Sequence, residues 1–145
     1  MVARLARLGW LETIDTSVTP NFVANLAENY KGRSFDPDTN LAAPWQSGMT
    51  GLGFDQKKTG ALDSIEVLFT DQFKGQLTYL SEMRDTIGLS AIRLGSKPEE
   101  LTQEQFDAAL AEVDKAIKAE IVRQVTGNSY VEDMAGGGVI LSMAW

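Results

Sequence analysis

Apolar positions recur every three or four residues in two stretches of the second half of the chain, and this spacing predicts two helices. The first helix carries its apolar positions at Met83, Ile87, Ala91 and Leu94. The second, longer and amphipathic, carries them at Phe106, Leu110, Val113, Ile117 and Ile121. Gly95 predicts the end of the first helix. Thr102 and Gln105 have the spacing of a capping box and predict the start of the second.

Short apolar runs bounded by glycine or turn residues predict the strands. These runs are residues 76–80, 121–125 and 139–145. A fourth segment, 47–56, alternates small and apolar residues, and its three glycines indicate a bend or a close backbone approach. The remaining patterns predict helices at 2–8, 19–30, 61–75 (ending in a turn) and 129–135.

Strands and helices alternate through the second half of the chain. This alternation predicts an α/β fold with a mostly parallel sheet flanked by helices and connected by right-handed crossovers. In open sheets of this kind, ligands bind beyond the carboxyl ends of the strands. The candidate site therefore lies where residues 81–85, 126–130 and 145 follow the three predicted strands.

Two carboxylates, Glu82 and Asp85, follow the predicted strand at 76–80, where the first helix begins. Acidic residues in the first turn of a helix are stabilised by its dipole by ~0.3–1 kcal/mol each, so helix capping alone explains the pair. Arg84 lies between them and, in this interpretation, neutralises one of them. Their position at the carboxyl end of a strand supports a second interpretation, in which they bind a cation.

Aromatic and polar residues are predicted at or near the same edge. Trp145 ends an apolar strand, so it either closes the core or forms the wall of a cationic site through cation–π contact. Carboxylates beside an indole face suit a diamine or polyamine, whose methylenes pack on the ring. Tyr130 and Asn128 supply hydrogen-bonding groups, although Asn128 is equally suited to a turn. Trp45 precedes the glycine-rich segment and belongs either to the core or to a cleft.

Composition narrows the chemistry. The 145 residues suffice for one domain with a core. With 20 acidic and 13 basic residues, the chain has a formal net charge of −7, which argues against nucleic acid and is compatible with a cationic ligand. The absence of Cys and His removes thiol nucleophiles, Cys or His metal sites and the Ser-His-Asp triad. We expect no metal and no cofactor.

Four stretches carry a family resemblance, in the family's order and spacing across the chain. They are residues 1–15, 44–55, 69–95 and 129–145, which read MVARLARLGWLETID, PWQSGMTGLGFD, FTDQFKGQLTYLSEMRDTIGLSAIRLG and SYVEDMAGGGVILSMAW. The chain resembles the spermidine/putrescine-binding proteins of ABC transporters, within the extracellular solute-binding proteins that have the type II periplasmic-binding fold.

The resemblance implies two α/β lobes joined by crossing strands, with the ligand in the cleft between them. Residues 1–46 then correspond to the tail of the first lobe, 47–56 to the crossover and 57–145 to most of the second lobe. The ligand-binding positions of the family fall on Glu82, Asp85, Trp145 and the segment containing Asn128 and Ser129. Trp45 stays a candidate cleft residue. Glu82 stands where the family usually has Asp, Gly127 where Ser is common, and Ser47 where an aromatic is usual.

The resemblance also implies a biological role. The expected protein is non-catalytic, binds putrescine or spermidine, delivers it to an ABC permease and works in the periplasm or outside the cell in association with the membrane, its signal peptide lying outside this chain. Further family ligand residues fall before Met1 and after Trp145. We therefore expect a central fragment that binds polyamines weakly or not at all alone, with an exposed lobe face that favours a homodimer or segment exchange.

Three alternatives stay open at this stage. In the first, the chain belongs to the same superfamily but binds another small solute. In the second, it is a structural lobe without activity of its own. The third alternative is an enzyme that uses Glu82 and Asp85 as an acid/base pair, as glycosidases use two carboxylates. No other feature of the sequence indicates a sugar site.

Overall fold

The computed structural model describes residues 2–145, which divide into two compact units with the boundary between Gly48 and Met49. The N-terminal unit contains α1 (Val2–Arg7) and α2 (Pro20–Asn25) with short 3-10 turns at Thr16–Val18 and Glu28–Tyr30. The predicted first helix is confirmed, with a left-handed Gly9 just beyond it. The helix predicted for 19–30 stops early, because Leu26 adopts an extended conformation.

Loops make up most of the N-terminal unit, and one carboxylate organises them. Asp36 is 4% exposed, and its side chain accepts hydrogen bonds from the backbone N–H groups of Asn40, Leu41 and Ala42, each at 3.0 Å. No other described residue of this unit is buried. This polar anchor therefore substitutes for an apolar core there.

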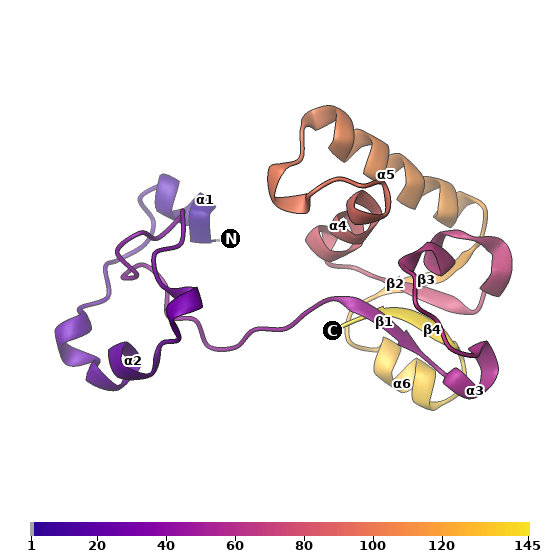
Figure 1. Ribbon diagram of the computed structural model, residues 1–145, viewed down its shortest axis with the longest axis horizontal. Coiled ribbons are helices and arrows are strands. Elements are labelled where there is room, and N and C mark those ends of the chain that lie inside the picture. The colour runs from indigo at the N-terminus through magenta and orange to yellow at the C-terminus, as the bar shows by residue number, and fades with distance from the viewer. Residues whose placement is uncertain (1) are drawn as a thin grey trace. The chain divides into compact units, whose positions relative to one another are not determined.

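The C-terminal unit is built on a four-stranded sheet (Figure 1). Its strands are β1 (Gly51–Phe54), β2 (Leu77–Leu80), β3 (Val122–Thr126) and β4 (Leu141–Ala144), in the order β1-β4-β2-β3. The central strand β2 pairs in parallel with β3 and β4, whereas β1 pairs antiparallel with β4. The predicted α/β class with a mostly parallel sheet is confirmed, and the glycine-rich strand forms an antiparallel edge.

Helices cover both faces of this sheet. Figure 1 shows α4 (Met83–Arg93) and α5 (Gln103–Lys118) on one face and α6 (Tyr130–Ala135) on the other. The short α3 (Gln56–Thr59) follows β1. The helix predicted for 61–75 is wrong as an α-helix, because two 3-10 turns, Ile65–Phe69 and Asp71–Phe73, form there instead. Between them, the backbone of Thr70 is extended, which interrupts any continuous helix.

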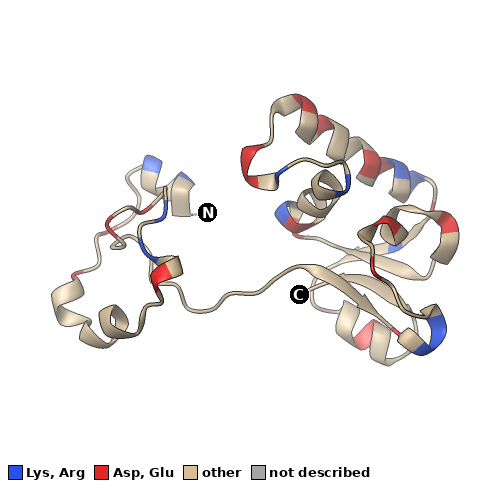
Figure 2. Ribbon diagram, viewed as in Figure 1, with Lys and Arg blue, Asp and Glu red and all other residues tan. Residues whose placement is uncertain are grey.

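The capping box of α5 is confirmed, but the predicted apolar face is only partly correct. Thr102 and Gln105 exchange both capping hydrogen bonds. Within the helix, however, the buried side chains are those of Ala109, Val113 and Ala116, whereas Leu110 and Ile117 are exposed. Ala109 packs against Ile87 and Ala91 of α4, and the buried Ser90 hydroxyl donates to the carbonyl of Ala109 at 2.8 Å. Acidic and basic residues are distributed along α5 (Figure 2).

Polar groups also connect the layers of the C-terminal unit. The buried Tyr79 hydroxyl donates to the carbonyl of Leu68 at 2.8 Å, and burial raises the pKa of this phenol. The guanidinium of Arg93 lies 4.8 Å from the ring centroid of Phe69 and binds Glu66 and Glu112. Hydrogen bonding to Glu66 raises the already high pKa of Arg93. These contacts fix α4 against its neighbouring segments.

No helix within residues 2–145 combines the length and hydropathy that crossing a membrane requires. Within the same residues, no cluster of three or more acidic side chains is placed to hold a metal ion.

Candidate functional site

Asp85 lies in the first turn of α4, directly beyond the carboxyl end of β2. The helix start is anchored to the strand by Thr86, whose buried hydroxyl donates to the carbonyl of Leu80 at 2.6 Å. The side chain of Asp85 is half-buried. The local sequence thus places a partly accessible carboxylate at the strand edge where ligands bind in such sheets.

Two neutral donors hold the carboxylate of Asp85, one on each oxygen. The hydroxyl of Thr50 donates to Oδ1 at 2.9 Å, and the indole Nε1–H of Trp145 donates to Oδ2 at 2.7 Å. Neither donor carries a charge, so the negative charge of Asp85 is not neutralised by them. Each carboxylate oxygen accepts more than one hydrogen bond. Asp85 is therefore an oriented anion with acceptor capacity left for a ligand.

Trp145 follows β4, and it contacts the Asp85 carboxylate although the two residues are 60 positions apart in the sequence. Its side chain packs edge-on against the ring of Tyr130, with centroids 6.3 Å apart and planes at 64°. The Tyr130 hydroxyl accepts from the backbone N–H of Trp145 at 3.1 Å and donates to its carbonyl at 3.2 Å. With 51% of its surface exposed, Trp145 is not a core residue. Its indole is held in place and still presents surface to solvent.

Glu82 occupies the N-cap position of α4, and its side chain accepts from the backbone N–H of Arg84 at 3.3 Å. The Arg84 guanidinium approaches the same carboxylate only to 4.0 Å, and both side chains are largely exposed. Capping thus accounts for the position of Glu82. The two carboxylates differ in their partners. Asp85 accepts hydrogen bonds from residues that flank β1 and β4, whereas Glu82 accepts one only from its own helix.

Asn128 and Ser129 lie in the turn between β3 and α6, at the same sheet edge. The segments that follow β2 and β3 are linked by a hydrogen bond from the backbone N–H of Ser81 to the carbonyl of Thr126 at 2.8 Å. The hydroxyl of Ser129 hydrogen bonds with that of Thr126. The side chains of Asn128 and Ser129 are exposed. The structure therefore brings hydroxyl and amide groups to the edge where Glu82 begins α4.

Trp45 belongs to the N-terminal unit and is 92% exposed, which makes the core interpretation wrong. It lines an open hollow of about 260 Å³ in that unit together with Phe22 and Tyr30. Its predicted role as a cleft residue stays a prediction.

Thr50 is the polar contact that sequence reasoning missed. It precedes β1, and the register that pairs Gly51 with Ala144 brings the start of β1 beside the end of β4. A threonine before a glycine-rich strand gives no sign of such a contact. Only the antiparallel pairing of β1, which the sequence pattern does not encode, would have revealed it.

A mostly parallel sheet with one antiparallel edge strand, helices on both faces and polar groups at the carboxyl edge matches part of a periplasmic-binding-protein-like α/β domain. Comparison with solved structures finds proteins that share this fold. The chain is similar to the Tp0655 (TpPotD) lipoprotein of Treponema pallidum, with a TM-score of 0.88 and 19% identity. It is also similar to PotD, a spermidine/putrescine ABC transporter substrate-binding protein of Streptococcus pneumoniae, with a TM-score of 0.78 and 16% identity.

A third similar structure, a Listeria monocytogenes protein assigned to a spermidine/putrescine ABC transporter, has a TM-score of 0.85 and 19% identity. The three matches cover 99% of this chain but only 44–45% of each of those proteins. No protein-family model and no curated protein matches the sequence. The resemblance expected from the sequence is thus confirmed at the level of the fold. Two of the three, the proteins of Streptococcus pneumoniae and Listeria monocytogenes, are named for a spermidine/putrescine ABC transporter.

Proposed function

We propose that this chain is part of the solute-binding component of an ABC transporter and that it binds a polyamine such as putrescine or spermidine. The observation that carries the proposal is the contact between Asp85 and Trp145, which places an oriented, anionic carboxylate beside a half-exposed indole. Two proteins with the same fold are named for spermidine/putrescine ABC transporters, which supports the choice of ligand.

The chemistry of a polyamine matches these groups. An ammonium end donates charge-assisted hydrogen bonds to the unoccupied acceptor positions of Asp85. The adjacent methylenes and the cation pack on the indole of Trp145, a contact worth ~0.5–2 kcal/mol. Asn128 and Ser129 supply polar contacts at the same edge, and the exposed Glu82 supplies a second negative charge. The net charge of −7 favours the approach of a cation.

The proposed affinity of this chain alone is low. It aligns with only 44–45% of each similar protein, so we propose that it supplies part of a cleft. One partly exposed ion pair contributes ~0.2–1 kcal/mol and one cation–π contact ~0.5–2 kcal/mol. These terms stay below the ~4 kcal/mol of millimolar affinity. We therefore expect a dissociation constant in the millimolar range or weaker.

The domain assignment and the cellular role belong to the same proposal. The boundary between compact units at Gly48 and Met49 supports assigning 1–46 to the first lobe, 47–56 to the crossover and 57–145 to the second lobe. The proposed partner is an ABC permease, and the proposed location is the periplasm or the outer surface of the cell. Another small cationic solute is the alternative ligand. We propose no catalytic role for Glu82 and Asp85, because Glu82 caps its helix and Asp85 is fixed by Thr50 and Trp145.

Self-association is a further part of the proposal. Large apolar side chains are exposed on one helix, including 44% of Leu110 and 42% of Ile117 on α5. Such surface favours pairing with a second copy. Light scattering on the purified chain tests this, and a monomer at all concentrations would contradict it.

The binding proposal is tested by NMR titration of the ¹⁵N-labelled chain, because NMR measures weak affinities. The indole N–H signal of Trp145 is assigned by its loss in Trp145→Phe. Putrescine and spermidine are added at constant ionic strength, with 1,4-butanediol as an uncharged ligand of similar length. We expect the two amines, and not the diol, to shift the Trp145 signal with saturation.

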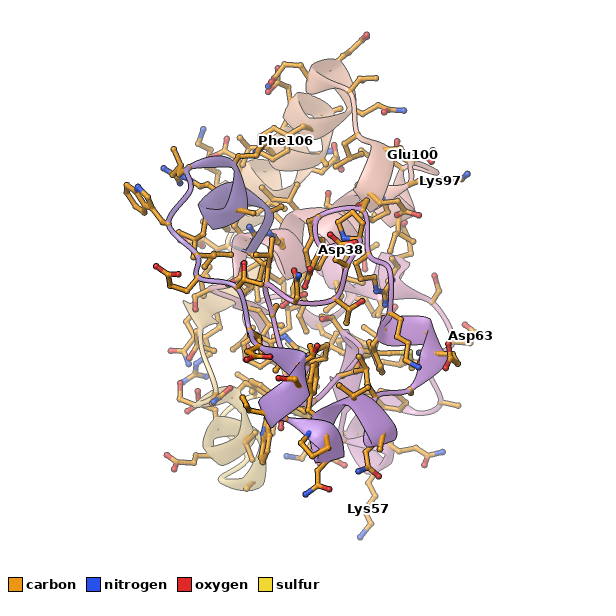
Figure 3. All side chains as sticks on the ribbon, turned by 90° about the vertical axis from the view of Figure 1, so that its left-hand side faces the viewer. Asp38, Lys57, Asp63, Lys97, Glu100 and Phe106 are labelled. Carbon is orange, nitrogen blue, oxygen red and sulfur yellow. The ribbon has the colours of Figure 1, made fainter. Side chains whose placement is uncertain are left out.

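Two variants with the same change of charge complete the test. Asp85→Asn removes the proposed ligand carboxylate, and we expect it to weaken binding by up to roughly fivefold, the factor that corresponds to ~1 kcal/mol. Asp63→Asn removes an exposed carboxylate elsewhere in the C-terminal unit (Figure 3) and should leave binding unchanged. The polyamine proposal would be wrong if the Trp145 signal did not respond to either amine, or if both variants bound as the unaltered chain does.

A further inference from the structure

We infer that Thr50 is a positioning residue of the solute site, which acts on the ligand through Asp85 rather than by touching it. The inference rests on the proposed function and adds to it a residue that neither the family resemblance nor the sequence pattern indicates. The observation behind it is the 2.9 Å hydrogen bond from the Thr50 hydroxyl to Oδ1 of Asp85, between residues 35 positions apart.

The topology of the sheet makes this contact possible. Thr50 directly precedes β1, and β1 runs antiparallel to β4 with Gly51 opposite Ala144. The start of β1 therefore lies beside the end of β4, where Trp145 follows. Thr50 and Trp145 reach Asp85 from the ends of two different strands, while Asp85 itself belongs to α4. Three separate elements converge on one carboxylate.

Holding both oxygens restricts rotation about the Cβ–Cγ bond of Asp85. With one donor on Oδ1 and one on Oδ2, the carboxylate plane is defined before a ligand arrives. If the Thr50 donor is removed, only the Trp145 indole holds the group, and binding must then order it. Preorganisation of this kind contributes to affinity by lowering the ordering cost. The hydroxyl is uncharged, so this effect is separate from the charge of Asp85.

Thr50 also has a side-chain shape suited to the task. Its β-branched side chain has few χ1 rotamers, so the hydroxyl position is well defined. Val keeps the branched shape and removes the donor, whereas Ser keeps the donor and removes the methyl group. Thr50→Val and Thr50→Ser therefore separate the hydrogen bond from the packing of the residue.

The test is the putrescine titration by ¹⁵N NMR on the unaltered chain, Thr50→Val and Thr50→Ser, with the overall spectrum of each variant reporting its fold. We expect Thr50→Val to weaken putrescine binding by roughly twofold and Thr50→Ser to restore most of it. In the absence of ligand, the Trp145 indole N–H signal should also move in Thr50→Val, because its acceptor changes orientation. Thr50→Ser, which keeps the donor at the same position, should move that signal much less than Thr50→Val does.

The outcomes separate this inference from the proposed function. If the unaltered chain binds putrescine and Thr50→Val binds equally well, Thr50 has no positioning role and the proposed function stands. If Thr50→Ser is as weak as Thr50→Val, the methyl group rather than the hydrogen bond matters, and the inference is wrong. If the unaltered chain does not bind either amine, the proposed function and the role of Thr50 fall together.

Discussion

The guanidinium of Arg93 binds both carboxylate oxygens of Glu66, through Nε to Oε2 at 2.7 Å and Nη2 to Oε1 at 2.8 Å. Its remaining nitrogen, Nη1, donates to Glu112 at 2.6 Å. Glu66 lies in the 3-10 turn Ile65–Phe69 and Glu112 in α5, so one side chain of α4 joins three segments. The Arg93 side chain is only 19% exposed, which protects these ion pairs from solvent better than surface pairs.

Replacing Arg93 with Lys should destabilise the C-terminal unit, because an ammonium cannot reproduce the planar fork that binds two carboxylates. We expect a loss of ~1–3 kcal/mol, the range for hydrogen bonds to charged groups. Urea-induced unfolding, followed at the indole signal of Trp145, measures it. The control is Arg84→Lys, at a side chain that is 69% exposed, which should change the free energy of unfolding by less than ~0.5 kcal/mol. Equal effects of the two substitutions would contradict the prediction.

The Glu66 carboxylate makes the free energy of unfolding depend on pH in the acidic range. Hydrogen bonding from Arg93 lowers the pKa of Glu66 below its ordinary value of 4.5. The stabilisation is therefore fully present above about pH 4.5 and is lost as the pH falls through the lower pKa of the folded state. Because the Glu66 side chain is 52% exposed, solvent screening limits the effect to ~0.2–1 kcal/mol.

Comparison of the unaltered chain with Glu66→Gln isolates this contribution, because the other carboxylates titrate in both proteins. We expect the difference in free energy of unfolding between the two proteins to shrink as the pH is lowered from neutral to below 4. A difference that stayed constant over this range would show that Glu66 does not titrate differently in the folded state.

Two glycines of β1 should differ in their tolerance of alanine. A Cβ atom at Gly53 would lie 3.0 Å from Cβ of Ala144 and 3.6 Å from the sulfur of Met134, whereas one at Gly51 meets no atom within 4 Å. We expect Gly53→Ala to cost ~1–3 kcal/mol through overpacking. Gly51→Ala should be neutral or slightly stabilising. Thermal unfolding of the two variants compares them directly, and equal melting temperatures would rule out this close approach of β1 to β4.

Trp145 combines two roles that substitution can separate. Trp145→Phe keeps an aromatic face but removes the donor to Asp85, so putrescine binding should weaken by a few fold. Trp145→Ala removes both and should weaken it by roughly a further two- to fivefold, since a cation–π contact at an exposed site contributes ~0.5–1 kcal/mol. Titration followed at backbone amide signals near Asp85 measures both. Binding by Trp145→Ala equal to that of the unaltered chain would exclude the indole from the site.

The sequence by itself determined the features that depend on short-range patterns. The period of apolar residues defined α4 and α5, and the capping box of Thr102 and Gln105 defined where α5 begins. The alternation of elements determined the α/β class, and the rule that ligands bind at the carboxyl ends of strands led to Glu82, Asp85 and Trp145. The sequence also contained the two alternatives for the carboxylates, helix capping or ligand binding, without deciding between them.

The tertiary structure decided what depends on contacts between distant segments. The folded unit buries Ala109, Val113 and Ala116 of α5 and leaves Leu110 and Ile117 exposed. Both sets of residues have helical spacing, so only packing against the rest of the unit decided which face of the helix is buried. Long-range pairing of β1 with β4 brought Thr50 to Asp85. The two carboxylates, three residues apart and chemically alike, thereby became different: Glu82 caps its own helix, and Asp85 is oriented by two other strands. The physical reason is that hydrogen bonds across 35 and 60 positions depend on which strands pair and in which direction, and this pairing joins segments that lie far apart in the chain.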